Sequence, residues 1–365
     1  MAGINTKGEY PEKISSYLKE KIQIILEEYG EDSFEYRALA LQYIKQKDEN
    51  IQTEENNRRH WEADVVTKLE NTDILHGMER LYNRTLVIEP TMICASHCRY
   101  CLRGNYDVFT VNKSDLCSVA KYCGTVGKST GLNEVLITGG DPLIAPDLLN
   151  YLIDCLIEYA DNIRIIRIAT RLITHDPQRI GNTFFNILKN SSKNLRFEIA
   201  TQINHSVEFF PETIEVIEKI RETNTPIYAQ NVLLKGVNDD KEELLKLYNT
   251  MRYYDVEPHY LFHCVPIKGM HHLRTTVQRG IELTEELVNS GKLSGRGKPM
   301  YTLMTDIGKV TLYDGVISDK KDGYLHIRTK YKYADRLKWN PSWVLPETAY
   351  VDDNGYIGIR YLDGH

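Results

Sequence analysis

The sequence predicts an α/β fold in which a parallel sheet curls into a partial barrel and is covered by helices. Two observations predict it. Short apolar, β-branched runs recur after residue 84, and a longer amphipathic stretch follows each of them. Six such βα units are too few for an eight-stranded barrel, so a partial barrel or an open sheet is expected. Functional sites on such sheets lie where the strands end.

The expected strands and helices alternate along the chain. Strands are expected at Thr85–Ile88, Glu134–Thr138, Arg164–Ala169, Leu195–Ala200, Pro226–Leu233 and Glu257–His263. Helices are expected at Ser114–Thr125, Pro146–Tyr159, Gln178–Lys189, Pro211–Thr223, Lys241–Tyr254 and Thr276–Asn289. Ser114 is the expected cap of the first helix. Pro146 suits the first turn of the second, and Asp240 precedes the fifth.

Two regions with a different texture flank this α/β core. Residues 1–78 are rich in Glu, Lys and Gln and predict a helical N-terminal region, so that the core spans 79–291. Residues 292–365 are rich in Gly, Lys and Tyr and predict a β-rich C-terminal extension that could close over the barrel mouth. Its strands are expected at Tyr301–Met304, Lys309–Tyr313, Tyr324–Lys330 and Tyr356–Tyr361.

The composition excludes several classes of protein. The 45 basic and 51 acidic residues give a net charge of −6, so an overall basic field for nucleic acid is absent. No run of ~18 apolar residues occurs, so no membrane span is expected. The polar N-terminus has no signal-peptide core. Seven unevenly placed cysteines argue against a disulfide framework, and a reducing, cytoplasmic location is expected.

Three cysteines within eight residues are the most informative motif. Cys94, Cys98 and Cys101 follow the first expected strand, a spacing that random placement of seven cysteines would give in about 0.3% of such chains. Thiolates bind iron–sulfur clusters, and three thiolates leave one iron of a [4Fe–4S] cluster open for a small molecule. Structural zinc is the alternative, but zinc needs four ligands and His97 could supply one only with strain. The other cysteines are expected to be buried apolar residues: Cys117, Cys123, Cys155 and Cys264.

This CxxxCxxC motif after the first strand of a six-unit βα series resembles the radical S-adenosylmethionine (SAM) enzymes. The resemblance implies a [4Fe–4S] cluster, SAM on its open iron, a 5′-deoxyadenosyl radical and an external electron donor such as a reductase, flavodoxin or ferredoxin. Gly139, Gly140 and Asp141 end the second strand and resemble the family's glycine-rich motif that holds the SAM amino group. Taken alone they would also suit a tight βα turn.

Four later stretches, at residues 163–180, 200–205, 230–239 and 259–275, resemble in this order lysine 2,3-aminomutase and its relatives. The resemblance implies pyridoxal 5′-phosphate (PLP) and a 1,2-migration of an amino group. It places Lys309 as the PLP anchor and Arg103 on the carboxylate of the substrate. It adds as cofactor-binding residues Thr170, Arg171, Gln202, His205 and Gln230. Each of these residues could also have a purely structural role without a ligand. Lys309 would then be a surface lysine and His205 a polar core residue.

Departures from the lysine enzymes concern the substrate. In those enzymes two aspartates recognise the distal ammonium, but one of these positions is Val265 here, and Asp306 does not align with the other without a gap. Because burying an ammonium without a carboxylate is costly, the expected substrate is a small amino acid-like molecule other than lysine. Lys268 would suit an anionic or neutral side chain.

Two other functions remain open. A PLP-independent radical SAM enzyme, such as an epimerase, dehydrogenase or lyase acting on a metabolite or peptide, is suggested by the short segment before Lys309, which has one glycine where the family has several. An iron–sulfur electron carrier without catalytic activity is the third option. The sequence does not define the oligomer, and a homo-oligomer is compatible with it.

Overall fold

The computed structural model describes residues 10–57, 77–105, 111–190 and 194–364. Its large sheet has nine strands, which neighbour one another in chain order: β1 (Met78–Glu79), β2 (Thr85–Thr91), β3 (Glu134–Gly139), β4 (Ile165–Ala169), β5 (Arg196–Thr201), β6 (Ile227–Leu233), β7 (Val256–His263), β8 (Met300–Thr305) and β9 (Gly308–Thr311). Strands β2 to β8 are parallel, whereas β1 and β9 pair antiparallel at the two edges.

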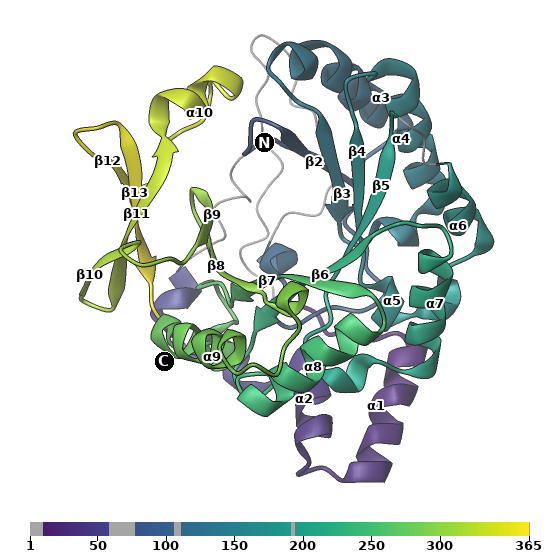
Figure 1. Ribbon diagram of the computed structural model, residues 1–365, viewed down its shortest axis with the longest axis vertical. Coiled ribbons are helices and arrows are strands. Elements are labelled where there is room, and N and C mark those ends of the chain that lie inside the picture. Colours follow the sequence, from purple (N-terminus) through teal and green to yellow (C-terminus); the bar gives the residue numbers. More distant parts are fainter. Residues whose placement is uncertain (1–9, 58–76, 106–110, 191–193, 365) are drawn as a thin grey trace.

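Each of the strands β2 to β7 is followed by at least one helix before the next strand. These helices are α3 (Lys113–Tyr122), α4 (Pro146–Tyr159), α5 (Leu172–His175), α6 (Asn182–Lys189), α7 (Pro211–Arg221), α8 (Lys241–Tyr253) and α9 (Val277–Val288). The strands curl around an interior and the helices lie outside them (Figure 1). The predicted α/β partial barrel is therefore confirmed. In the described ranges no helix has both the length and the apolar character needed to cross a bilayer.

The alternation of side chains along β3 explains how one sheet serves both a core and a site. Val135 and Ile137 point outward and are fully buried in the core. Leu136 and Thr138 point to the other face, where they line the interior cavity. The face with Glu134, Leu136 and Thr138 is the more polar one, because it is less buried than the face that packs into the core.

Helix caps explain where several of these helices begin. Asp240 caps α8 and accepts a hydrogen bond from Glu243 N, as the sequence predicts. The cap predicted for α3 is wrong: Asn112, not Ser114, caps this helix. Asn112 accepts from the Asp115 N–H at 2.9 Å, and Asp115 accepts from the Asn112 N–H at 3.3 Å. Only a cap at 112 places a carboxylate three residues later for this reciprocal pair.

The helical N-terminal region is confirmed where it is described. Helices α1 (Ser16–Tyr29) and α2 (Phe34–Tyr43) pack together beside the barrel (Figure 1). Leu18, Leu39 and Tyr43 form a small apolar core with Phe210, which directly precedes α7 of the barrel. Residues 58–76 of the predicted region lie outside the described residues.

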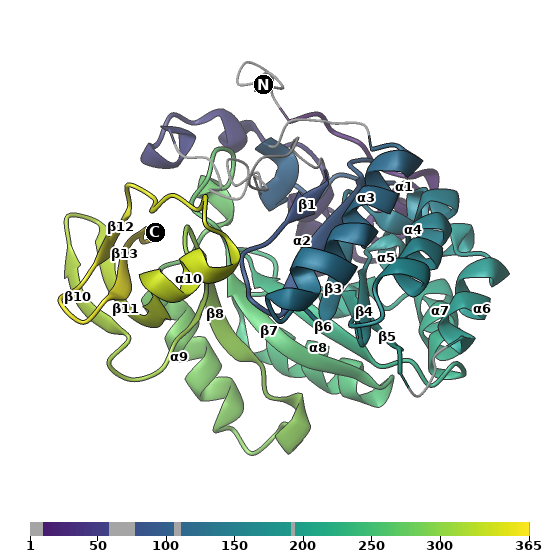
Figure 2. The same cartoon turned by 90° about the horizontal axis from the view of Figure 1, so that it is seen from above.

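The C-terminal extension forms a second, smaller sheet that contacts both edges of the large one. Its order is β10 (Ile317–Lys321), β11 (Tyr324–Lys332), β13 (Tyr356–Leu362) and β12 (Ala349–Val351), with α10 (Tyr333–Trp339) after β11. It lies across the molecule from α6 and α7 (Figure 2). Tyr331 donates to the Lys309 carbonyl at 2.6 Å, and Trp339 donates to the Leu81 carbonyl at 3.4 Å. Strands β8 and β9, predicted within the extension, belong to the large sheet, and the division into three regions stays a prediction.

Candidate active site

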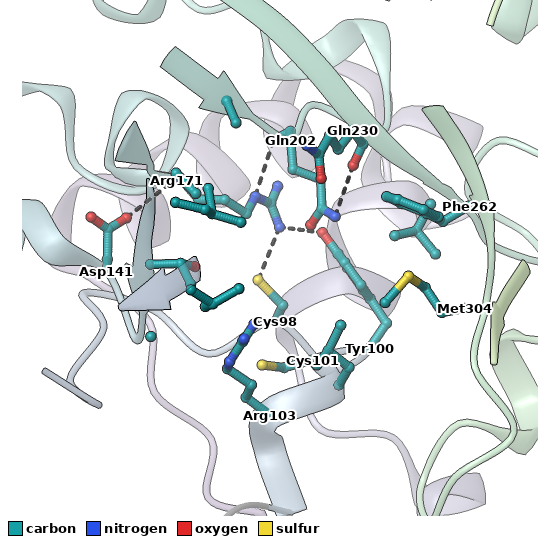
Figure 3. Close-up of a pocket in the computed structure, with 18 of the residues that line it drawn as sticks. Cys98, Tyr100, Cys101, Arg103, Asp141, Arg171, Gln202, Gln230, Phe262 and Met304 are labelled. Carbon is teal, nitrogen blue, oxygen red and sulfur yellow. Dashed lines mark hydrogen bonds between the residues drawn. The ribbon is translucent and has the colours of Figure 1, made fainter. Parts of the chain in front are cut away.

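A cavity of about 980 Å³ lies on the concave side of the large sheet (Figure 3). Its walls come from the loop after β2, from the strands β3 to β7, and from β8 and β9 at the far edge. Almost all predicted site residues line it: Cys94, Cys98, Cys101, Arg103, Gly139, Gly140, Asp141, Thr170, Arg171, Gln202, Gln230 and Lys309. The sequence thus identified the elements that meet here, although they span more than 200 residues of the chain.

The three predicted cluster ligands carry free thiols around this cavity. Burial is the main cause that raises the pKa of the Cys94 and Cys101 thiols, and the neighbouring thiols of the triad add to it. Within the described residues no three His, Cys, Asp or Glu side chains are grouped so that they could hold a single metal ion. An iron–sulfur cluster bonds each of its cysteines through a different iron atom, so its ligands need not converge on a single ion.

The segment before α1 fastens the cysteine loop, which sequence analysis did not foresee. Lys13 Nζ donates to the Cys94 carbonyl at 2.6 Å, and His97 N donates to the Lys13 carbonyl at 2.7 Å. The His97 ring nitrogen Nδ1 lies 2.8 Å from the Pro11 carbonyl. His97 is thereby engaged with the backbone of this segment. The polar residues of the segment have no periodicity that would reveal these contacts.

The glycines of the Gly-Gly-Asp turn are required by the chain itself. Gly139 has φ +107°, and a Cβ there would lie 2.4 Å from the Thr91 carbonyl oxygen. A Cβ on Gly140 would lie 2.4 Å from the Ile93 carbonyl oxygen. The turn instead bonds to that segment: Gly140 N donates to Thr91 O at 2.7 Å and Asp141 N to Ile93 O at 2.9 Å. The glycines therefore allow close packing against the backbone that leads to Cys94.

Replacing Gly140 by alanine should destabilise the protein by about 3 kcal/mol, because the new methyl group meets backbone atoms that cannot move aside as a side chain would. Thermal or denaturant unfolding measures this change. Gly295 is the matched control, since a Cβ there meets nothing within 4 Å and should change stability by less than about 0.5 kcal/mol. Equal stability of the two variants would contradict this explanation of the turn.

Asp141 was predicted to accept a bond from the SAM amino group, but its carboxylate already has several donors in the protein. Thr170 Oγ1 lies 2.9 Å from both carboxylate oxygens, and the N–H groups of Arg171 and Leu172 donate at 2.8 and 2.9 Å. Burial raises the pKa of Asp141 to about 6. Asp141 thus ties the end of β3 to the end of β4. These contacts within the protein argue against the predicted bond from the SAM amino group to this carboxylate.

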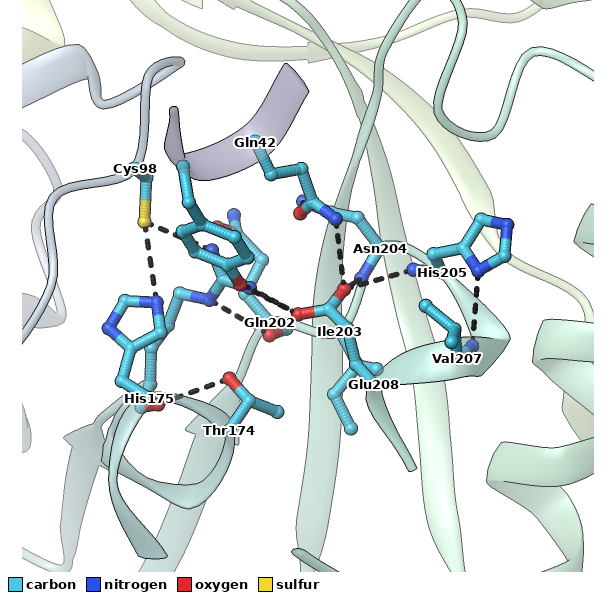
Figure 4. A network of polar contacts seen from close by, with 12 residues as sticks. Gln42, Cys98, Thr174, His175, Gln202, Ile203, Asn204, His205, Val207 and Glu208 are labelled. Atoms are coloured by element: carbon cyan, nitrogen blue, oxygen red, sulfur yellow. Dashed lines mark hydrogen bonds and ion pairs between the residues drawn. The ribbon is translucent and has the colours of Figure 1, made fainter. Parts of the chain in front are cut away.

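Gln42 of α2, Glu208 and Cys98 of the cysteine loop belong to one network of polar contacts (Figure 4). Arg171 joins Glu208 to Cys98 in this network. Its Nη2 donates to Glu208 Oε2 and to the Tyr43 hydroxyl, both at 2.7 Å, and its Nη1 lies 3.0 Å from Cys98 Sγ. Glu208 is 1% exposed and also accepts from the Asn204 N–H at 2.8 Å. Sequence analysis missed Tyr43 and Glu208, which lie far apart in sequence and carry no motif of their own.

His205 is the one predicted cofactor residue that does not line the cavity. Its side chain is fully buried, and Nδ1 accepts from the Val207 N–H at 3.1 Å, as a cap of the following turn. The same Nδ1 lies 3.5 Å from Glu243 Oε1. This placement argues against contact with a cofactor and supports the polar-core interpretation that the sequence left open.

The buried carboxyl of Glu243 should make the stability of the protein depend on pH. It is 6% exposed, and burial raises its pKa to about 7. The folded state therefore favours the protonated carboxyl, and this contribution is present below about pH 4.5 and lost as pH rises through about 7. The loss is at most about 3 kcal/mol. Glu243→Gln should flatten the decline of Tm between pH 5 and pH 8, whereas the exposed Glu242→Gln should keep it. Identical profiles for the two variants would refute this.

Arg103 lines the cavity but is already paired. Its Nε contacts Glu89, which is 2% exposed, and its Nη2 lies 3.4 Å from Glu79 Oε2. A substrate carboxylate would have to share the guanidinium with these groups, which makes the predicted binding of that carboxylate less favourable. Another cation that sequence analysis missed, Arg167, lines the cavity from β4 and pairs with Glu198 at 3.2 Å.

Lys309 points its amine into an aromatic part of the cavity. Its Nζ lies 5.0 Å from the ring centre of Tyr260 and 5.4 Å from that of Phe262. The backbone N–H of Lys309 donates to the Tyr82 hydroxyl at 2.9 Å. The preceding Gly308 has φ +111°, and a Cβ there would lie 3.0 Å from that hydroxyl oxygen. A single glycine therefore suffices to bring the Lys309 strand against Tyr82.

Lys268, which the sequence suggests for an anionic or neutral substrate side chain, does not line the cavity.

Comparisons with known proteins show what this chain is similar to. The model of the "Radical SAM superfamily" matches residues 88–248. The chain is 32% identical over 325 residues to a "Putative L-lysine 2,3-aminomutase" of Aquifex aeolicus (strain VF5), covering 87% of this chain and 81% of that protein. It is 31% identical over 253 residues to the glutamate 2,3-aminomutase of Clostridioides difficile (strain 630), covering 68% of this chain but only 58% of that longer protein. A solved radical SAM methyltransferase from Sphaerobacter thermophilus aligns with TM-score 0.48 and 16% identity over 63% of this chain and 69% of that one.

Proposed function

The chain belongs to the radical SAM superfamily and to its lysine 2,3-aminomutase-like members, and from this premise we propose a PLP-assisted 1,2-migration of an amino group on an amino acid other than lysine. The family implies a [4Fe–4S] cluster and SAM. The observation that carries the proposal is one cavity lined by the three cysteines from one edge of the sheet and by Lys309 from the other. Such a cavity can hold both cofactors around one substrate.

At the cysteine side, Cys94, Cys98 and Cys101 would hold the cluster, and SAM would complete its open iron. The Gly-Gly-Asp turn would present its backbone to the amino end of SAM. Thr170, Arg171, Gln202 and Gln230 lie around the same cavity. Gln202 is fixed by a bond from its Nε2 to the Gln230 carbonyl at 3.0 Å. These contacts support a shaped SAM site at the ends of β3 to β6.

At the opposite side, Lys309 would anchor PLP. When bound, PLP delocalises electrons and carries the migrating nitrogen of the substrate. Tyr260 and Phe262 provide flat apolar walls beside the amine, which suit an aromatic cofactor ring. Tyr82 and Tyr331 fix the backbone of Lys309 from both sides, through its N–H and its carbonyl. The lysine is thus held on a rigid strand rather than on a mobile loop.

The charges of the cavity argue against lysine as the substrate. Of the residues that the structure describes, four arginines and lysines line it: Arg103, Arg167, Arg171 and Lys309. Among the described lining residues Asp141 is the only carboxylate, and its oxygens are engaged by Thr170 and Arg171, which follow β4. Val265 lines the cavity where the lysine enzymes would have an aspartate, and Asp306 lies outside the lining and contacts Thr348. Among the described lining residues a distal ammonium would find only a carboxylate that Thr170 and Arg171 already engage, so a neutral or anionic side chain fits better.

The experiment is a substrate panel with the reconstituted, reduced protein, SAM and PLP. Glutamate, neutral amino acids and lysine are incubated separately, and products are examined for a nitrogen moved from the α to the β carbon. The proposal predicts a β-amino product from a neutral or anionic substrate and none from lysine. Conversion of lysine alone would contradict the substrate class. Consumption of SAM without PLP, with the product nitrogen in place, would select the PLP-independent alternative.

A further inference from the structure

Two cysteine sulfurs of the triad face side-chain hydrogen-bond donors. Arg171 Nη1 lies 3.0 Å from Cys98 Sγ (Figure 3), and the Tyr10 hydroxyl is hydrogen-bonded to Cys101. His175 Nε2 is also near Cys98 Sγ, at 3.7 Å. Neither Arg171 nor Tyr10 belongs to the CxxxCxxC motif, and they approach the loop from different sides: Arg171 from the end of β4 and Tyr10 from the segment before α1.

The guanidinium of Arg171 is held in this orientation. Glu208, 2% exposed at its side chain, neutralises it at 2.7 Å, and Tyr43 accepts from the same Nη2 at 2.7 Å. Its Nε donates to the Gln202 carbonyl at 3.1 Å, and Nη1 also contacts the Tyr100 hydroxyl. Because the Arg171 side chain is only 11% exposed, turning Nη1 away from the sulfur would break several buried bonds at once.

Tyr10 is fixed as firmly. Its ring stacks on His97, with 4.9 Å between the ring centres, and the guanidinium of Arg99 lies 4.9 Å from the centre of the same ring. The Tyr10 carbonyl accepts from Arg99 Nη2 at 3.0 Å. On the other side, a Cβ on Gly104 would lie 3.3 Å from ring atoms of Tyr10, so the ring packs closely on that backbone.

We infer that Arg171 and Tyr10 donate hydrogen bonds to the cluster-binding sulfurs of Cys98 and Cys101 and raise the reduction potential of the cluster. This inference rests on the proposed function, which supplies the cluster. Reduction adds one electron, and the added negative charge is shared with the thiolate sulfurs. Donors aimed at these sulfurs stabilise the reduced form more than the oxidised form. The contribution of Arg171 is the larger, because its donor carries a charge.

The test is a redox titration of the reconstituted protein in the absence of SAM, followed by EPR of the reduced cluster. Four proteins are compared: the unaltered chain, Arg171→Gln, Tyr10→Phe and Tyr17→Phe. Tyr17 is the control, because it is another tyrosine of the N-terminal region, but its hydroxyl bonds to Glu212 at 3.2 Å. Iron content is measured first, and affinity for SAM is measured separately for each protein.

The inference predicts a more negative midpoint potential in Arg171→Gln, a smaller negative shift in Tyr10→Phe and no shift in Tyr17→Phe, with iron content preserved. An unchanged or more positive potential in iron-loaded Arg171→Gln, with affinity for SAM lost, would make Arg171 a SAM ligand only and overturn the inference. If Arg171→Gln takes up no iron, Tyr10→Phe decides by the sign of its shift. An unaltered protein that binds no iron would overturn the proposed function and this inference with it.

Discussion

Replacement of Cys98 by serine should abolish the cluster and reduce turnover more than about 100-fold, the upper range for loss of a supporting residue of a metal site. Cys98 is the middle thiol of the triad, and it contacts both Arg171 and His175. A serine hydroxyl is a far weaker ligand for iron than a thiolate, so two remaining cysteines would have to hold the cluster alone. Iron and sulfide analysis and the visible spectrum after anaerobic reconstitution measure this directly.

The control for this variant is Cys117→Ser. Cys117 is a free, partly buried thiol on α3 and does not line the cavity. Its replacement should leave iron content and activity close to those of the unaltered protein. If both serine variants kept their iron and activity, the assignment of the triad would be wrong. If both lost them, the effect would come from folding rather than from ligation, and circular dichroism would show it.

Lys309→Ala should remove the visible absorption of bound PLP and the amino migration with it. The amine of Lys309 lies over the rings of Tyr260 and Phe262, and PLP enzymes hold their cofactor through a lysine amine. The cluster should be unaffected, because Lys309 lies on β9 and the cysteines follow β2. Iron content therefore stays constant while PLP content falls. Borohydride reduction and mass spectrometry of the unaltered protein should locate the cofactor on the peptide that contains residue 309.

Lys330→Ala is the matched control, since Lys330 also lies over a tyrosine ring, that of Tyr356 at 4.9 Å, but on the small sheet. It should bind PLP normally. PLP absorption that persists in Lys309→Ala would contradict the assignment of this lysine. An unaltered protein that takes up no PLP yet cleaves SAM would instead support a radical enzyme without PLP.

The sequence predicted the barrel well because its signals are local and repeated. Each buried run between Thr85 and His263 became a parallel strand, and α4 spans Pro146–Tyr159 as predicted. The small sheet was harder to predict. Strand β10 is mostly exposed and polar, and β12 has only three residues, so neither has the apolar alternation that identifies a strand. Such elements form because their neighbours pair with them, which no local pattern reveals.

The sequence predicted which residues line the site better than it predicted how these residues contact one another. Motif spacing identified the cysteines and the Gly-Gly-Asp turn, but not that Asp141 bonds to Thr170. The family resemblance implied a role for Arg171, but did not reveal its partner Glu208, because an ion pair between residues that follow two different strands depends on the three-dimensional arrangement. The same limit explains His205: a polar residue after a strand can face either the cavity or the core, and only the packed structure decides between them.

The claim that a cluster on the cysteine triad cleaves SAM is tested most directly by the fate of SAM with the anaerobically reconstituted and reduced protein. Chromatography of the quenched reaction should show methionine and 5′-deoxyadenosine with the unaltered chain, and neither product with Cys98→Ser. Intact SAM after reduction of a protein that carries its full complement of iron would contradict this claim. The protein would then be better described as an iron–sulfur electron carrier.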